Sequence, residues 1–226
     1  MRNVRFNGPE IHEVVADTEI VNGKYRQVVV SVPQDSGAVD AFGRSRVSTP
    51  VLLIDLKRVG SAPDLQATQS VSGSGAVNYV ASRASNGLVV GPGVGTAIRQ
   101  TKARAIYQPG KSLQVFQSFI LAPQRTGLTQ RVGYFDNKNG IFFEVKGDSP
   151  GFVRRSFVTG AVQDHTIDRS EWNLDPIDGT GPSGVVLDIL KPNIFCADFE
   201  WLGVGRVRVG FVVNGKPLYA HEFQRY

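Results

Sequence analysis

Short runs in which apolar and polar side chains alternate fill most of the chain after residue 40. In residues 206–213 the apolar side chains face one way, and Arg206 and Arg208 face the other. An Asn-Gly pair follows and leads into a second run over 216–223. Asn-Gly between two such runs is the strongest short-range signal for a β-hairpin, because both residues tolerate the positive φ of a tight turn. The end of the chain is therefore predicted to be a hairpin.

The same pattern predicts about ten short strands and no helix inside this region. A second hairpin is expected where 131–136 and 141–146 flank Asn137–Gly140. Strands at a spacing of about 8 to 12 residues are typical of an all-β, antiparallel sandwich of two sheets, and the jelly roll is its most economical form. The remaining strands are expected at 47–57, 96–107, 112–121, 152–158, 185–189 and 194–201.

Glycine accounts for 25 of the 226 residues, and its clusters mark expected turns and loops. Ser70–Ala76 and Gly91–Gly95 are both predicted to be loops for this reason. The longest loop is expected over 164–184, where Trp172 is expected to anchor the chain to the core. Glycine-rich connections between short strands agree with a sandwich.

Residues 1–39 differ from the rest, and we predict that they form an extended N-terminal arm, which leaves 40–226 as the sandwich domain. Apolar residues within 10–20 have helical spacing, although their β-branched side chains disfavour a helix. A short strand is expected over 28–32, and 33–37 has the composition of a linker.

Composition and charge exclude several classes of function. Lys and Arg number 25 against 20 Asp and Glu, a net charge of +5, but the basic residues are scattered along strands and do not form a nucleic-acid site. Glu200 can neutralise Arg206 or Arg208 across a turn. A single cysteine excludes an intrachain disulfide, and Cys196 is expected to be a buried, small apolar residue. No apolar stretch approaches the roughly 20 residues of a membrane span, and no secretion signal is expected, which favours folding in a cytosol.

Two short motifs resemble catalytic or nucleotide-binding signatures, and neither fits the predicted strands. Ser149 lies in a Gly-x-Ser-x-Gly pattern. A nucleophile elbow needs a helix after the serine and a backbone N–H on the next residue, whereas a strand is expected there and Pro150 has no N–H. Gly110-Lys111-Ser112 lacks the first glycine of a phosphate-binding loop and also precedes a strand. We therefore predict no catalytic residue and no enzyme.

Two acidic turns are candidates for a calcium site. Asp136–Gly140 resembles the start of a calcium loop, but Lys138 stands at a ligand position and a glycine replaces the closing glutamate, so a hairpin is favoured. Asp175 and Asp178 are the better pair, because two carboxylates and several carbonyl groups converge there. The same residues also form good turns without an ion. No other cofactor is expected.

Five strings of residues resemble one family. They are Asp40–Val47, Tyr107–Ser112, Arg131–Asp136 with Asn139-Gly140, Trp172–Asp175 with Asp178–Gly184, and Phe199–Phe211. The family comprises structural proteins, or domains within larger ones, of tailed bacteriophages and some giant viruses. The strings occur in order from about residue 40 to 226, so the resemblance covers most of the chain, while residues 1–39 lie outside it. The family supplies no site residues that can be carried over.

The resemblance implies a non-enzymatic virion component, either of the tail fibre or baseplate type or a decoration of the capsid surface, with host attachment as one role. Its expected partners are other virion proteins, contacted through the arm, and further copies of itself. Three-fold and six-fold particle symmetry makes a trimer the first expectation. Such a protein is made in the host cytoplasm and leaves the cell within the particle.

A second class of function is a carbohydrate-active module, either a lectin-like binder or a glycan depolymerase on the particle. Sandwich folds often bind sugars on exposed aromatic side chains, and a host surface glycan would then be a partner. Trp172, Tyr79 and Tyr134 are the candidate glycan contacts. This alternative follows from analogy of fold.

Overall fold

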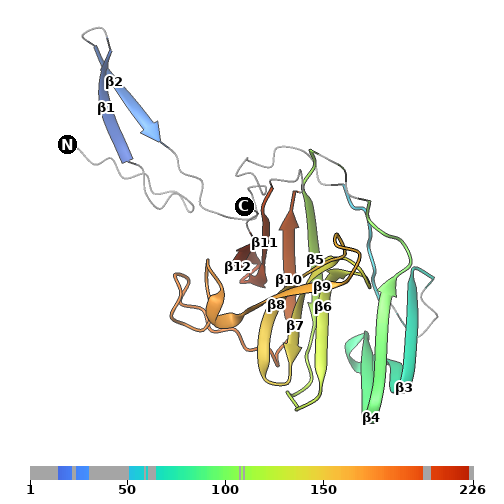
Figure 1. Cartoon of the computed structure of the whole chain (residues 1–226). Coiled ribbons are helices and arrows are strands. Elements are labelled where there is room, and N and C mark those ends of the chain that lie inside the picture. The colour runs from blue at the N-terminus through green and yellow to red at the C-terminus, as the bar shows by residue number, and fades with distance from the viewer. Residues whose placement is uncertain are drawn as a thin grey trace. The chain divides into compact units, whose positions relative to one another are not determined.

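The computed structural model describes residues 15–21, 24–30, 51–58, 60, 65–106, 108, 110–200 and 205–223, and in the first two ranges it defines strands only. The chain divides into two compact units, residues 1–46 with 109–226, and residues 47–108. Antiparallel strands make up nearly all of the regular structure (Figure 1). The prediction of an all-β, antiparallel fold is confirmed. No helix in the described part of the chain is long and apolar enough to span a membrane.

Two four-stranded sheets form the body of the first unit (Figure 1). One has the strand order β12-β11-β10-β5 and the other β6-β7-β8-β9. The short 3-10 helix η2 (Arg169–Glu171) follows β9. The strands are β5 (Leu113–Phe119), β6 (Thr129–Phe135), β7 (Gly140–Lys146), β8 (Ser149–Ser156), β9 (Gln163–Asp168), β10 (Asn193–Phe199), β11 (Val207–Val213) and β12 (Lys216–Phe223).

Phenylalanine side chains fill the space between the two sheets. Phe143 of β7 meets Phe211 of β11 edge-on, with ring centroids 5.1 Å apart. Phe152 of β8 lies 5.8 Å from Phe211 and 6.4 Å from Phe195 of β10. These four side chains are fully buried. Because each buried phenylalanine contributes about 1.5–3 kcal/mol, they hold the two sheets together, and the predicted sandwich is confirmed.

The jelly-roll form of the sandwich is not confirmed. Neighbouring strands in each four-stranded sheet are consecutive in sequence, apart from β5 beside β10. A jelly roll is built from two Greek keys, in which the chain repeatedly returns beside an earlier strand. The described strands instead form two meanders, β6 to β9 and β10 to β12, with β5 added at the edge of the second.

The two hairpins predicted from turn residues are present. Asn214 and Gly215 have φ of 51° and 78°, as a tight turn between β11 and β12 requires. β6 pairs with β7 around the turn that contains Asn137–Gly140, from Thr129 opposite Lys146 to Phe135 opposite Gly140. Strong local turn chemistry was therefore enough to place these four strands.

The second unit contains one long hairpin, which we call the ribbon: β3 (Ala67–Val80), the 3-10 helix η1 (Ala81–Arg83) and β4 (Ser85–Thr101). The predictions of loops at Ser70–Ala76 and Gly91–Gly95 are wrong, because both segments lie within these strands. The glycines serve close approach between strands: a Cβ on Gly73 would lie 2.0 Å from the Val94 carbonyl oxygen. A bulge interrupts the pairing between Gly73 and Gly75.

Other predicted boundaries need correction. Residues 51–58 are not a strand, and over 185–189 the chain makes only a single bridge, between Asp178 and Val186. β9 occupies the start of the predicted 164–184 loop. Within the predicted arm, β1 (Val15–Val21) and β2 (Lys24–Val30) form a hairpin, so β propensity prevails over the helical spacing. The predicted linker at 33–37 lies outside the described residues.

Candidate functional site

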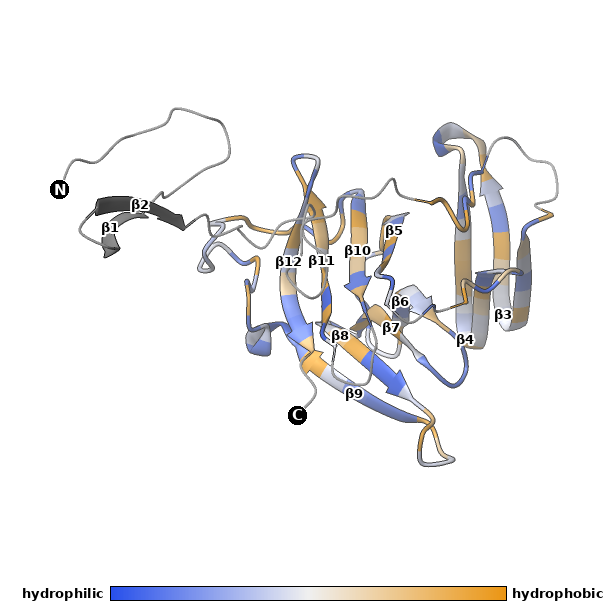
Figure 2. Cartoon of the chain, turned by 90° about the horizontal axis from the view of Figure 1, so that it is seen from above, coloured by the Kyte–Doolittle hydropathy of each residue, from blue (hydrophilic) through white to orange (hydrophobic). Residues whose placement is uncertain are grey.

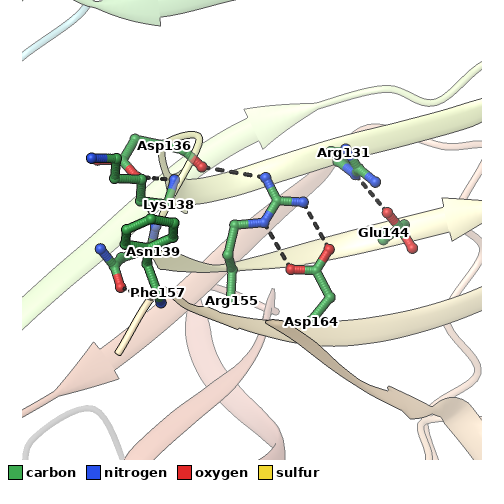
Figure 3. A network of polar contacts seen from close by, with 8 residues as sticks. All are labelled: Arg131, Asp136, Lys138, Asn139, Glu144, Arg155, Phe157 and Asp164. Atoms are coloured by element: carbon green, nitrogen blue, oxygen red, sulfur yellow. Dashed lines mark hydrogen bonds and ion pairs between the residues drawn. The ribbon is translucent and has the colours of Figure 1, made fainter. Parts of the chain in front are cut away.

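A network of ion pairs crosses the outer face of the sheet β6-β7-β8-β9 (Figure 3). Arg131 of β6 donates from Nε to Glu144 of β7 at 2.5 Å. Arg155 of β8 donates two hydrogen bonds to the carboxylate of Asp164 of β9, at 2.7 and 2.8 Å. The strand register places each pair directly opposite, so each ion pair ties one strand to its neighbour.

Phenylalanine rings pack against the arginine side chains of this network. The guanidinium carbons of Arg131 and Arg155 lie 5.4 and 5.3 Å from the centroid of the Phe142 ring. Phe135 packs against the same ring at 4.4 Å. Opposite Phe142 stands Gly133, where a Cβ would lie 2.4 Å from the Phe142 Cα. Phe142 points away from the sandwich core, yet these neighbours bury it completely. The network is therefore held rigidly by cation–π and ring contacts.

The β6–β7 turn extends the network at one end (Figure 3). Asp136 accepts hydrogen bonds from the backbone N–H groups of Lys138 and Asn139, both at 2.7 Å. Arg155 donates to the Asp136 carbonyl oxygen at 3.3 Å, and the Lys138 ammonium lies 4.8 Å from the Phe157 ring centroid. The Asp136 carboxylate thus closes a turn, which agrees with the hairpin interpretation of Asp136–Gly140 rather than with a calcium loop.

The ion pair between Arg155 and Asp164 shifts the pKa of both groups. The hydrogen bonds from Arg155 hold the pKa of Asp164 below its usual range. The same contact raises the pKa of Arg155. A carboxylate that stays ionised beside a fixed arginine does not supply the proton that general acid catalysis needs at neutral pH.

The loop after η2 covers the free edge of β12. The backbone N–H groups of Leu174 and Asp175 both donate to the Ala220 carbonyl oxygen, at 3.1 and 3.0 Å. The Asn173 side chain pairs with the Glu222 backbone as a strand would, donating to its carbonyl oxygen at 3.0 Å and accepting from its N–H at 2.8 Å. An edge strand covered in this way does not add strands from another chain.

The two calcium candidates hold this loop through backbone hydrogen bonds. Asp175 is 3% exposed, and its two oxygens accept from the N–H groups of Ile177, at 2.7 Å, and Ser183, at 2.8 Å. Asp178 accepts from the Thr180 backbone and hydroxyl, which lowers the pKa of its carboxyl. No group of three or more metal-binding side chains occurs among the described residues. The geometry gives both aspartates turn-forming roles.

An ion pair is buried on the outer side of β10 and β11. Arg208 donates to Asp198 at 2.7 Å, and both side chains are 0% exposed. The Tyr219 hydroxyl donates to the same carboxylate at 3.2 Å, and burial raises its pKa. Burial also raises the pKa of the Cys196 thiol to about 12, as expected for a cysteine that behaves as a small apolar residue.

Arg206 and Arg208 each pair with an acidic residue of a neighbouring strand, and the prediction that Glu200 neutralises one of them stays a prediction. Arg206 pairs with Glu222 at 2.8 Å, and Arg208 pairs with Asp198. The Arg208 side chain is fully buried, although it is charged. Asp198 inside the apolar run of β10 was the signal in the sequence for a buried counter-charge.

The three candidate glycan contacts have different surroundings. Trp172 is 6% exposed and stacks on Phe152, with ring centroids 4.4 Å apart, as expected of a loop anchor. Tyr134 is half-buried and lies 5.8 Å from the Phe199 ring. Tyr79 belongs to the ribbon, where the Arg58 guanidinium lies 4.9 Å from its ring. The buried Trp172 presents no free ring face of the kind on which a sugar stacks.

The two rejected motifs lie where the sequence placed them. Ser149 begins β8, and Pro150 pairs with Val145 in the sheet, so a strand and not a helix follows the serine. Lys111 and Ser112 lead into β5, again a strand. The structure therefore provides neither a nucleophile elbow nor a helix N-terminus at these positions.

A hollow of about 390 Å³ lies between the connection that follows β5 and the β7–β8 turn. Arg125, Lys146 and Asp148 are among its lining residues, and all three are exposed. A ligand there would keep much of its surface in water, which contrasts with the enclosed sites that bind small molecules.

The chain matches no protein-family model, no curated protein and no solved structure.

Proposed function

We propose that the chain is a non-enzymatic structural component of a tailed-phage virion, of the tail fibre or baseplate type or on the capsid surface. It assembles in the host cytoplasm with other virion proteins and with further copies of itself. The sequence strings that resemble phage and giant-virus structural proteins support this proposal. A rigid sandwich with a phenylalanine core and a surface of locked ion pairs suits a structural role.

The observation that carries the proposal is the hairpin β1–β2. It is a two-stranded sheet, and among the described strands neither of its outer edges pairs with a third. A two-stranded hairpin is marginally stable by itself in water. Its free edges can pair with a strand of a neighbouring protein, and main-chain hydrogen bonds then supply the affinity. At the edge of β12, by contrast, the Asn173 side chain already takes the place of an added strand.

Deletion of residues 1–35 tests the proposal, because it removes the whole hairpin. We expect a soluble protein that keeps the near-ultraviolet circular dichroism of the aromatic core but no longer incorporates into particles. Incorporation is measured by sedimenting particles from infected cells that supply either the full chain or the truncated chain. Particles that contain the truncated chain at the normal level would show that the hairpin is not the attachment element.

A further inference from the structure

The second unit exposes its apolar side chains instead of burying them. Of the 18 large hydrophobic side chains that are exposed among the described residues, 11 belong to residues 47–108. Within the described part of that unit, Ala67 is the only buried residue. A unit of this size needs a buried core to offset the entropy lost on ordering its chain. Exposed apolar side chains gathered in this way mark a surface for contact with another molecule.

Both faces of the ribbon are apolar between the bulge and η1. Val77 pairs directly with Leu88, on the face that also carries Val90. Ala76 pairs with Val89 on the opposite face. Leu88 and Val89 are 50% and 49% exposed, and Figure 2 shows the mixture of orange and pale residues along β4. Continuous apolar runs of this kind are typical of strands that are buried on both faces.

The ribbon carries almost no charge. From Ala67 to Thr101 the sequence has no Asp or Glu, and Arg83 and Arg99 are its only charged residues. A charged partner would find few opposite charges here, whereas a second copy of the ribbon meets no row of like charges. Natural edge strands usually carry charges or prolines that block pairing, and these long edges have few of either. The low charge of the ribbon therefore favours a second copy of this chain as its partner.

The area of each ribbon face indicates whether an assembly must cover one face of the ribbon or both. Strands about 4.8 Å apart with a rise of about 3.3 Å per residue give each face of the 14-residue β3 and its partner a flat area of about 450 Å². A standard interface buries about 800 Å² on each partner, so a dimer through one face falls short of this size, whereas a ring covers both faces of every chain, about 900 Å² per chain. Contact between unlike faces of successive copies is head-to-tail, and such contacts form a closed ring when the rotation between copies completes a full turn and an open filament when it does not.

We propose that the β3–β4 ribbons of three chains pack face to face in a closed ring, with the Leu88 face of each ribbon against the Val89 face of the next. Three is the smallest number that closes such a ring. This inference rests on the proposed homo-oligomer and assigns its contact surface. The apolar side chains that are exposed in the single chain become the core of the assembly.

Light scattering after size-exclusion chromatography tests the ring with the full chain and the variants Leu88→Asp and Val89→Asp. Val158→Asp is the matched control, because Val158 is 87% exposed but belongs to the first unit. We expect three times the chain mass of 24.5 kDa for the wild type and the control, and a single chain mass for both ribbon variants. A buried, unpaired carboxylate should raise the dissociation constant at least about 100-fold. A monomeric wild type, or an oligomer that either ribbon variant retains, overturns the ring.

Hydrogen exchange of the wild-type chain tests the same contact without a variant that could fail to fold. In the wild type, amides of 85–101 should be protected in concentrated solution and should exchange faster on dilution, while amides of β10 and β11 stay protected. Equal exchange of 85–101 at both concentrations would overturn the proposed contact. The virion proposal is judged separately: a trimer that never enters particles refutes that proposal alone, and a virion protein whose ribbon variants stay trimeric refutes the ring alone.

Discussion

Trp172 holds the long loop after β9 against the end of the sandwich core. Its ring stacks on Phe152 and lies 6.3 Å from Phe211, and the Arg169 guanidinium lies 5.9 Å from it on the loop side. Within the described part of the chain, its buried Nε1 has no hydrogen-bond partner. The side chain therefore stabilises the fold through apolar contact and not through a polar bond.

This geometry separates the role of the Trp172 ring from that of its N–H group. Trp172→Ala should reduce the free energy of unfolding by about 3–5 kcal/mol, because it leaves a cavity beside Phe152. Trp172→Phe should cost less than half of that, since it keeps a stacked ring and removes only an unpaired donor. Urea denaturation measures both, with Phe116→Ala, at a position 50% exposed, as the control for loss of a surface ring. Equal stability of the alanine variant and the wild type would contradict a role as loop anchor.

Ion pairs show which residue contacts the sequence can place. Arg131 and Glu144 follow directly from the predicted hairpin, because the turn at Asn137–Gly140 fixes the register that puts them opposite each other. Arg155 and Asp164 are separated by a longer connection between β8 and β9, whose length leaves the register open. The register between β10 and β11 is left open in the same way. Contacts across a short turn can therefore be predicted from the sequence, whereas contacts across a long connection cannot.

At the scale of elements, the loop 169–188 and the edge of β12 form one unit that depends on His221. The His221 Nδ1 accepts a hydrogen bond from the Asn173 N–H at 3.3 Å, so the ring is neutral at this nitrogen in the docked loop. Burial lowers the pKa of His221, and the nearby charge of His165 lowers it further, against smaller effects of Glu222 and Glu171. Protonation of His221 Nδ1 would place its N–H against the Asn173 N–H. Two facing donors would weaken the contact between the loop and β12.

The sign of the pH effect follows from the lowered pKa. Below pH about 6.5 the unfolded chain binds a proton at His221 that the folded chain does not, so stability is full above this pH and falls below it. One proton limits the slope to about 1.4 kcal/mol per pH unit. Urea denaturation at pH 7.5 and 5.5 should show this loss in the wild type and a smaller loss in His221→Gln, which keeps a neutral acceptor. The lowered pKa of Asp164 affects stability only below pH about 4, outside this range. An identical loss in both proteins would exclude His221 as its source.

Glycine has two structural roles in this chain, one in tight turns and one inside closely paired strands. This explains why two strand segments of the ribbon were predicted to be loops. Asn214-Gly215 turns the chain because its positive φ values suit a tight hairpin. Gly75 and Gly95 instead lie inside paired strands, where a Cβ would come within 3.0 Å of the opposite strand. Local composition is the same in both cases, so only the partner strand distinguishes a turn from a close crossing. The sandwich strands, whose alternation is strong, do not suffer from this ambiguity.

The whole molecule joins two kinds of β structure with different requirements. The strands β5 to β12 bury their own phenylalanine core, whereas the ribbon presents apolar side chains on both faces without a core of its own. The sandwich therefore has its core within one chain, whereas the ribbon would gain a core only in the proposed assembly. Stability of the sandwich and self-association should then respond to different substitutions, since residues in separate clusters act additively.

Excision of the ribbon tests this division directly. The Lys102 N–H donates to the Gln66 carbonyl oxygen at 2.8 Å, so the two ends of the hairpin are adjacent and two glycines can join them in place of residues 67–101. We expect the shortened chain to keep the near-ultraviolet circular dichroism of the core and the urea sensitivity of the sandwich, because no core phenylalanine is removed. Its mass in solution should be that of one chain, measured by light scattering beside the full chain. Loss of the aromatic signal would show that the sandwich needs the ribbon to fold, and an unchanged oligomer would place the contact between copies elsewhere in the molecule.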